Sequence, residues 1–439
     1  MILLGRINNV ADVARWRLCA GCGACVPACP QRAIHLVDAQ DQGIRPVVDP
    51  LRCQHCGECI RVCPGVEIRH QRFNSETIVE LRQAWGPVLQ VWQGYAADPE
   101  IRFKASSGGA ATALALFYLQ EQKASGVLHT RADPEVPWRN IPVFSKTQEE
   151  LVAFSGSRYA PAAPCERFDW IEQADGKCIF IGKPCDVAAL RKSQAVNPKL
   201  DEKVGLAISI FCAGTPTTQA TRWLLSSLGV EPEQVKELRY RGYGWPGMTT
   251  VKVTGKDNKP RRMTYEQSWG NILSRHRQLR CHLCPDGTGG FADISCGDAW
   301  HLKTDTGDPG QSLILVRTDL GRHILHKAVS AGYLKLEKTD AAALPQSQRA
   351  LLKRRRHLWG RLLMMRAMGI TVPKYRGFRL FGNWRTLPLS EKMRSLLGTA
   401  KRIILRKLYM PVDKRSKSVK RPRSTFHQKH YHIVKQRTD

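Results

Sequence analysis

The chain has 439 residues, and its hydrophobic fraction of 42% and charged fraction of 24% are those of a globular protein of two to four domains. The net charge of +30 is concentrated at one end: residues 351–439 hold 25 Lys/Arg against 3 acidic residues, so the first 350 residues carry only +8. No apolar run reaches the roughly 18 residues of a membrane-spanning helix, and the apolar start is too short for a signal peptide. We therefore expect a cytoplasmic protein with a basic C-terminal appendage.

Residues 19–64 contain an internal repeat of cysteines, each half reading Cys-x2-Cys-x2-Cys-x3-Cys-Pro. Fifteen cysteines in a reducing compartment indicate metal ligation instead of disulfides. The repeat is the bacterial two-cluster ferredoxin pattern, in which the fourth cysteine of each half binds the other [4Fe–4S] cluster. Zinc is the alternative, but zinc sites take their ligands as two pairs. We predict one cluster on Cys19, Cys22, Cys25 and Cys63, and a second on Cys53, Cys56, Cys59 and Cys29.

The sequence that follows the repeat predicts a mixed α/β domain. Continuous apolar runs at 178–182, 204–212 and 312–318 predict buried strands, and segments 110–122 and 321–332 predict helices. The stretch that joins the two halves of the cysteine repeat predicts two short strands around a polar turn.

A run of small residues precedes the predicted helix at 110–122: Ser106, Ser107, Gly108 and Gly109. Small residues leave several backbone N–H groups open at the positive end of the helix, which suits an anion. A plain helix cap is the alternative. The run matches neither a Walker A loop nor a Gly-x-Gly-x-x-Gly fingerprint.

Five further motifs occur in a fixed order behind the cysteine repeat: FSGSRYAPAAP (154–164), FIGKPCDVAALRK (180–192), ISIFCAGTP (208–216), YRGYGWPG (240–247) and RCHLCPDGTGGFADISCGDAW (280–300). Together with the repeat they resemble the coenzyme F420 hydrogenase/dehydrogenase β-subunit family. Relatives of that family include 7-hydroxymethyl chlorophyll a reductase and the ferredoxin-type divinyl chlorophyllide reductase. The resemblance covers roughly residues 15–340.

The resemblance implies an FAD in the middle domain and a third [4Fe–4S] cluster beside it. The FAD contacts would be Ser106, Ser107, Gly108, Gly109, Thr112, Ser157 and Tyr159. The cluster ligands would be Cys185, Cys212, Cys281 and Cys284, with zinc as the alternative. We expect Cys165, Cys178 and Cys296 to be packing residues. Asp298 either faces the flavin or substrate, as a weak catalytic candidate, or closes a turn.

These features predict an α+β or mixed α/β protein of three parts. Residues 1–75 form the ferredoxin module, residues 85–345 the FAD domain (an N-terminal part at 85–165 and a C-terminal part at 166–345), and residues 346–439 the basic extension. The function expected is an oxidoreductase that passes electrons between ferredoxin-type clusters and FAD and exchanges a hydride with a deazaflavin or a conjugated organic substrate. Its partner would be ferredoxin or another redox protein. The alternatives are a non-catalytic electron-transfer subunit, and a basic membrane- or nucleic-acid-associated protein with structural clusters.

Two segments of the extension, 354–369 and 389–409, predict basic amphipathic helices. Three interpretations are open: helices docked on the protein body, contact with an anionic membrane at its inner face, or nucleic-acid binding, for which no recognisable module is present. We expect residues 413–439 to be disordered.

Overall fold

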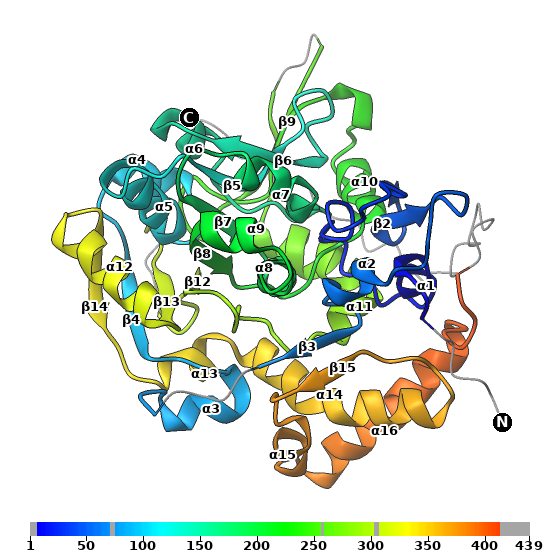
Figure 1. Cartoon of the computed structure of the whole chain (residues 1–439). Helices are drawn as coiled ribbons and strands as arrows, with labels where there is room; N and C mark the ends of the chain where they lie inside the picture. The colour runs from blue at the N-terminus through cyan, green and yellow to red at the C-terminus, as the bar shows by residue number, and fades with distance from the viewer. Residues whose placement is uncertain (1–6, 71–74, 256–258, 303–306, 413–439) are drawn as a thin grey trace.

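An eight-stranded mixed sheet forms the centre of the computed structural model, which describes residues 7–70, 75–255, 259–302 and 307–412 (Figure 1). The strand order is β14-β4-β13-β12-β8-β7-β5-β6. Strands β12, β8, β7 and β5 run parallel, and antiparallel strands close both edges. The strands are β4 (Gln90–Ala96), β5 (Gly126–Ala132), β6 (Asn140–Ser145), β7 (Cys178–Gly182), β8 (Val204–Ile210), β12 (Ile294–Asp298), β13 (Ser312–Val316) and β14 (Leu334–Lys338).

Helices cover both faces of this sheet. Helices α5 (Ala110–Glu121) and α12 (Asp319–Ser330) pack on one face, and α8 (Pro184–Gln194) packs on the other. Within β7, Ile179 belongs to the first core and Phe180 to the second, because successive side chains of a strand point to opposite faces. Burial on both faces explains the continuous apolar runs of the sequence. The predicted strands and helices of this region are confirmed.

Shorter helices connect the strands of the central sheet. They are α3 (Val79–Trp85), α4 (Pro99–Lys104), α6 (Gln148–Ala153), α7 (Phe168–Glu172), α9 (Pro198–Lys203) and α11 (Leu279–His282). A separate three-stranded sheet of β9 (Val235–Arg239), β10 (Thr249–Val253) and β11 (Arg261–Met263) packs with α10 (Thr218–Ser227) around its own apolar core. The segments that follow β9 and β11 supply Arg241, Tyr265 and Trp269 to the wall of the cavity described below.

The N-terminal module contains the predicted pair of strands. Its elements are α1 (Val10–Arg15), β1 (Ile34–Ala39), β2 (Gly43–Val48), α2 (Glu58–Arg61) and β3 (Glu67–Arg69). The β1–β2 hairpin docks on the start of α10, where Thr218 donates to the carboxylate of Asp38 at 2.8 Å. Gly43 stands at φ 89° against the Gln278 side chain, which a Cβ would meet at 2.6 Å. The module is therefore packed closely against the sheet domain.

The basic extension is an integral part of the fold, so its description as an appendage is wrong. It contains α13 (Ala343–Ser347), α14 (Arg349–Ala367), β15 (Lys374–Arg376), α15 (Leu380–Arg385) and α16 (Leu389–Leu405). Strand β15 pairs in parallel with β3 of the ferredoxin module. Helices α14 and α16 lie side by side below the sheet (Figure 1). The high positive charge suggested an exposed tail. Arg354 and Arg355 are instead buried in α14, where backbone carbonyls accept their hydrogen bonds.

No helix among the described residues is both long and apolar enough to cross a membrane. The stretch expected to be disordered, 413–439, lies outside the described residues.

Candidate functional site: three cysteine sets and a shared cavity

The first cysteine set is brought together as the crossed ferredoxin pattern predicts. Cys19, Cys22, Cys25 and Cys63 line one small cavity of about 20 Å³. Burial, together with the charges of the neighbouring Cys22 and Cys19, raises the pKa of Cys63 to about 12. Such mutual repulsion is the signature of thiolates grouped around one point. The amide of Gly21 donates to the Cys19 sulfur at 3.3 Å, which would stabilise negative charge on a bound cluster.

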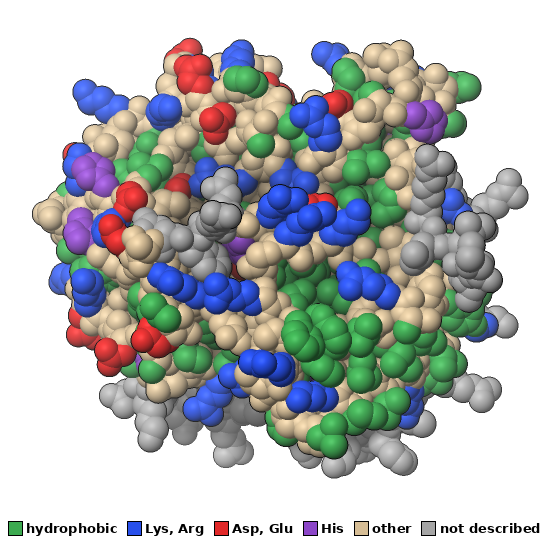
Figure 2. Space-filling model, turned by 60° about the horizontal axis from the view of Figure 1, so that its bottom comes forward, with side chains coloured by type: hydrophobic (Ala, Val, Ile, Leu, Met, Phe, Trp, Pro, Cys, Tyr) green, Lys and Arg blue, Asp and Glu red, His purple; other side chains and the backbone are tan. Residues whose placement is uncertain are grey.

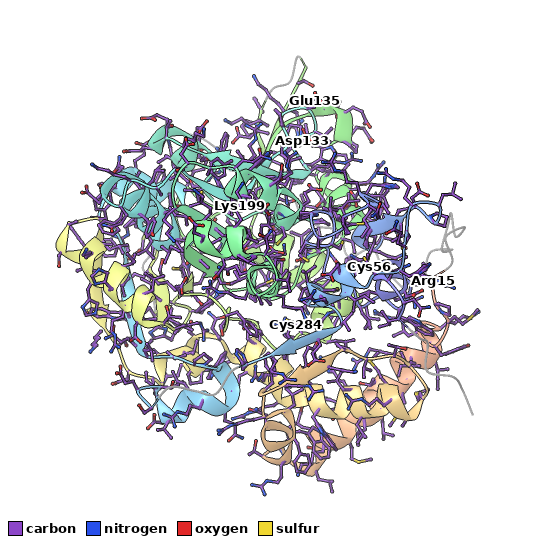
Figure 3. All side chains as sticks on the ribbon, in the orientation of Figure 1. Arg15, Cys56, Asp133, Glu135, Lys199 and Cys284 are labelled. Atoms are coloured by element: carbon purple, nitrogen blue, oxygen red, sulfur yellow. The ribbon has the colours of Figure 1, made fainter. Side chains whose placement is uncertain are left out.

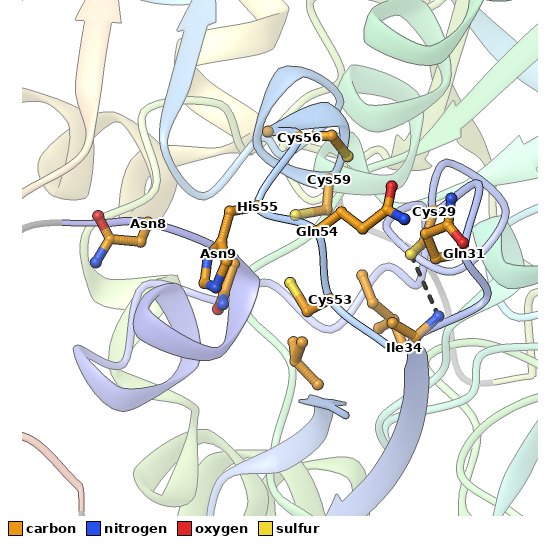
Figure 4. A pocket seen from close by; sticks show the side chains of 13 residues that line it. Asn8, Asn9, Cys29, Gln31, Ile34, Cys53, Gln54, His55, Cys56 and Cys59 are labelled. Atoms are coloured by element: carbon orange, nitrogen blue, oxygen red, sulfur yellow. Dashed lines mark hydrogen bonds between the residues drawn. The ribbon is translucent and has the colours of Figure 1, made fainter. Parts of the chain in front are cut away.

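The second set surrounds a similar cavity at the outer end of the module. Cys29, Cys53, Cys56 and Cys59 line it (Figure 4). Burial raises the pKa of Cys59, and the charges of Cys29, Cys56 and Cys53 add to the rise. Cys56 is exposed, whereas the members of the first set are buried or half-buried. Both sets of four thus lie together, and their ligation of clusters stays a prediction.

The third set comes from three distant parts of the chain. Cys185 stands in the first turn of α8, Cys212 follows the carboxyl end of β8, and Cys281 and Cys284 lie in and after α11. Burial, together with the charges of Cys281 and Cys284, raises the pKa of Cys212 to about 12. Burial also raises the pKa of Cys185, with Cys212 and Cys284 among the contributing charges. The four thiols predicted to hold a third cluster are therefore neighbours.

Arginines from the C-terminal helix reach the third set. Arg354 donates to the carbonyls of Cys212 at 3.1 Å and Ala213 at 2.8 Å, and Arg361 donates to that of His282 at 2.8 Å. Burial raises the pKa of Cys284, and Arg354 opposes that rise. Positive charge beside buried thiols favours an anionic cluster at this position.

Zinc stays the alternative for the third set. One zinc ion holds its thiolates at about 2.3 Å from a single centre. Among the described residues, no group of three or more His, Cys, Asp or Glu side chains is arranged to hold a single metal ion, and this includes the two N-terminal sets. The cluster on the third set therefore stays a prediction.

The three leftover cysteines are buried, and their surroundings differ. Cys178 donates to the carbonyl of Gly176 inside an apolar core, in agreement with a packing role. Cys296 lies on β12 in the wall of the large cavity, and burial raises its pKa to about 12. Cys165 is in contact with Cys22, because the amide of Cys165 donates to the carbonyl of Cys22 at 3.0 Å. Sequence reasoning missed this last contact because no spacing pattern links the two positions.

A cavity of about 290 Å³ lies at the carboxyl ends of the central strands. This edge of a parallel sheet is where α/β proteins place their ligands. The volume is close to the lower end of the range for ligand sites, about 300–1,000 Å³. Its walls include six of the seven residues predicted to contact FAD, together with Cys212 and Asp298: Ser106, Ser107, Gly109, Thr112, Ser157 and Tyr159.

The start of α5 forms one end of this cavity. Gly108 and Gly109 adopt φ of 63° and 79°, and a Cβ on Gly108 would meet the backbone nitrogen of Ser312 at 2.8 Å. Gly108 thus lies behind the wall and shapes the turn. Ser106 accepts a hydrogen bond from the amide of Ser157 at 2.7 Å. The hydroxyl of Ser107 is buried and has no hydrogen-bond partner among the described residues.

The unpaired hydroxyl of Ser107 bears on whether the site fits a phosphate. Buried polar groups are nearly always paired, and an unpaired one indicates a missing ligand or water. The Ser107 hydroxyl stands beside the open N–H groups of a twelve-residue helix, where an anion is stabilised. The residues present therefore fit the pyrophosphate of a dinucleotide such as FAD.

The opposite wall is aromatic and carries a buried ion pair. Arg241 donates to both oxygens of Asp298, at 2.7 and 2.9 Å, and Trp245 donates to the same carboxylate at 2.8 Å. Burial lowers the pKa of Arg241, but the charge of Asp298 outweighs that effect and raises it overall. Tyr265 and Trp300 stack at 5.5 Å between ring centroids, with the Arg241 guanidinium 5.0 Å from the Tyr265 ring.

The ion pair with Arg241 bears on the role of Asp298, for which the sequence left two possibilities, a weak catalytic candidate or a residue that closes a turn. Its carboxylate oxygens are occupied by Arg241 and Trp245, and Ser347 and Gln348 of the extension donate to its backbone carbonyl at 2.8 and 2.9 Å. These contacts favour a positioning role for Asp298 in the cavity wall, and its catalytic role stays an untested prediction. Sequence reasoning missed Arg241, although it lies in the YRGYGWPG motif, because its partner is 57 residues away.

The described fold and cysteine sets define a mixed α/β iron–sulfur electron-transfer protein with a ferredoxin-like module. Residues 91–168 match the N-terminal model and residues 175–342 the C-terminal model of the coenzyme F420 hydrogenase/dehydrogenase β subunit. Residues 18–65 match a 4Fe-4S dicluster domain. The chain belongs to the coenzyme F420 hydrogenase/dehydrogenase β-subunit family, which confirms the resemblance seen in the sequence.

Two curated relatives are coenzyme F420 hydrogenase β subunits. That of Methanococcus voltae is 27% identical over 288 residues, covering 63% of this chain and 95% of the relative. That of Methanosarcina barkeri is 27% identical over 258 residues, covering 55% and 79%. A chain of the F420-reducing [NiFe] hydrogenase complex from Methanosarcina barkeri is 23% identical, with a TM-score of 0.48 over 63% of this chain and 94% of that one.

Proposed function

We propose that the chain is an iron–sulfur flavoprotein oxidoreductase. It would pass electrons between three [4Fe–4S] clusters and FAD, and exchange a hydride with a deazaflavin or another conjugated organic substrate. One observation supports this best: Cys212, from the third set, lies in the wall of the same cavity as Ser107 and the start of α5. A cluster on the third set would therefore adjoin whatever the cavity binds.

Different residues of the cavity would bind different parts of FAD. The amides at the start of α5 and the Ser107 hydroxyl would bind its pyrophosphate. The Tyr265–Trp300 pair offers a flat apolar surface, which suits a planar ring system. Arg241, held by Asp298, places a fixed positive charge beside that surface. When bound, FAD supplies the conversion between hydride transfer and single-electron transfer, which neither clusters nor an organic hydride carrier can do alone.

A second function is favoured by the relatives, whose names describe subunits of larger enzymes. This chain would then carry electrons for a catalytic partner and reduce no organic substrate itself. In either case a ferredoxin or another redox protein would exchange electrons with the exposed side of the N-terminal module.

The two functions are separated by anaerobic purification followed by cofactor analysis and reduction. We expect about twelve irons per chain, as three [4Fe–4S] clusters require, and an equivalent of FAD. Bleaching of the bound flavin by a reduced deazaflavin as well as by reduced ferredoxin would identify a catalyst, and bleaching by ferredoxin alone a conduit. About eight irons without flavin would contradict both the third cluster and the FAD site.

We also propose that α16 contacts an anionic membrane surface. One face of α16 docks on α14, with Ser395, Thr399 and Ile403 buried, so the docked interpretation holds for that face. A second face is exposed and apolar. Figure 2 shows hydrophobic side chains bordered by Lys and Arg on the side of the molecule where α14, α15 and α16 lie. The exposed side chains are Leu389, Met393, Leu397 and Ile404, at 42–73% exposure.

This membrane contact predicts a lipid-dependent association. The full chain should float with vesicles that contain phosphatidylglycerol and remain unbound with pure phosphatidylcholine, because each basic residue near the surface contributes about 1 kcal/mol. Leu397→Glu/Ile404→Glu should abolish flotation. Leu51→Glu, at an exposed leucine of the N-terminal module, is the matched control. Equal flotation of both variants, or binding of RNA in place of vesicles, would contradict the proposal.

A further inference from the structure

The two N-terminal cysteine sets differ in what surrounds them. The second set packs only within its own module, in a core formed by residues 10–63. Cys22 of the first set belongs instead to a core of the sheet domain that reaches residue 292. Cys19 and Cys63 pack against the C-terminal helices in a third core. The first set is therefore the inner one, and the second faces outward.

The contact at Cys22 leaves no space between module and sheet domain. A Cβ on Gly23 would meet the backbone nitrogen of Glu166 at 2.8 Å and the carbonyl oxygen of Ala163 at 3.1 Å. Cys165, which lies between those two residues, has no exposed surface, and Cys22 has 8%. The junction is therefore close-packed, and close approach is what direct electron exchange between two redox sites requires.

Cys165 connects the inner set to the third set by hydrogen bonds on both sides. Its amide donates to the carbonyl of Cys22 at 3.0 Å, and its thiol donates to the carbonyl of Asp186 at 3.5 Å. Asp186 is the peptide neighbour of Cys185, a member of the third set. The route from Cys22 to Cys185 thus crosses two hydrogen bonds and otherwise follows covalent bonds.

We propose that Cys165 is the link through which single electrons pass between the inner N-terminal cluster and the third cluster, and that the outer cluster at Cys56 exchanges electrons with the external donor. The inference rests on the proposed function, since it assumes that all three sets hold clusters. In each step one cluster is oxidised by one electron and its neighbour is reduced by one. No bond is made or broken and no proton moves. Figure 3 labels Cys56, on the ferredoxin module, and Cys284, of the third set.

The test compares two buried cysteines of one apolar core. Cys165→Ala removes the thiol that reaches Asp186, and Cys178→Ala removes an equally buried thiol of the same core whose hydrogen bond goes to the carbonyl of Gly176. The anaerobic protein is mixed rapidly with a reduced two-cluster ferredoxin, which is too large to enter the cavity. Freeze-quench electron paramagnetic resonance then follows the N-terminal clusters and the third cluster separately, and absorbance follows the flavin.

We expect the N-terminal clusters of Cys165→Ala to be reduced at the wild-type rate, and its third cluster and flavin several-fold more slowly. Cys178→Ala should match the wild type in every phase. Cys165→Ser, which keeps a donor, should recover part of the rate, and Cys165→Val repeats the test without leaving a void. Equal rates in Cys165→Ala and Cys178→Ala with full iron content would overturn the link. A wild-type protein that lacks the third cluster or flavin would instead contradict the proposed function.

Discussion

Replacing Cys281 and Cys284 together by serine is expected to lower the iron content from about twelve to about eight per chain, because one of three [4Fe–4S] clusters is lost. The remaining two clusters should still be reduced by ferredoxin, whereas the bound flavin should no longer bleach. The flavin should lose its electron supply because Cys281 and Cys284 are half of the third set, and Cys212 of that set lines the cavity proposed for FAD. Iron and sulfide analysis with anaerobic absorbance spectra measures both effects.

The same double variant should unfold at a lower temperature than the wild type. Metal-binding free energy is also folding free energy where the ligands are brought together only by the fold. The third set joins α8, β8 and α11. Without a cluster, Arg354 and Arg361 would lose an anionic neighbour, and their positive charges would repel each other. Cys296→Ser is the control, because this thiol also lies in the cavity wall but is not one of the four predicted ligands. A double variant that retains twelve irons would remove the third cluster from the scheme.

The sequence predicted the elements whose signal is local. The runs at 178–182 and 312–318 are strands because both faces of the sheet are covered, so every side chain in them must be apolar. The cysteine spacing predicted the two N-terminal sets, because each half of the repeat follows the ligand pattern of a two-cluster ferredoxin. The third set was implied by the family resemblance and not by spacing. The small residues before α5 also drew notice in the sequence, and the structure explains the glycines, because a Cβ on Gly108 or Gly109 would press against Ser312 or Ile101.

The parts that escaped prediction depend on long-range pairing. Nothing near residues 374–376 indicates that β15 joins β3 of the ferredoxin module, about 300 residues earlier. The arginines of α14 looked like a solvated charged face, because a sequence does not show which backbone carbonyls will accept their hydrogen bonds. For the same reason Arg241 and Cys165 carried no visible role until their partners, Asp298 and Cys22, were placed beside them.

Replacing Asp298 by alanine is expected to destabilise the protein by roughly 3–5 kcal/mol, the usual cost of removing one partner of a buried ion pair. Arg241 is 2% exposed and would keep its charge without a counter-ion. Trp245 would lose its acceptor as well, so that the aromatic wall around Trp300 should become disordered. We therefore expect a lower free energy of unfolding in denaturant titrations and a lower FAD content in the purified protein.

Two controls separate this effect from a general loss of charge. Glu237→Ala breaks a surface pair with Lys252, whose side chains are 39% and 54% exposed, and should cost less than about 1 kcal/mol. Asp298→Asn keeps the shape and one acceptor for Trp245, so its loss of stability should lie between the two. If Asp298→Ala were as stable as Glu237→Ala while catalysis was abolished, Asp298 would act on the substrate directly. If it lost stability but kept its full complement of FAD, the pair would support the second sheet without shaping the flavin site.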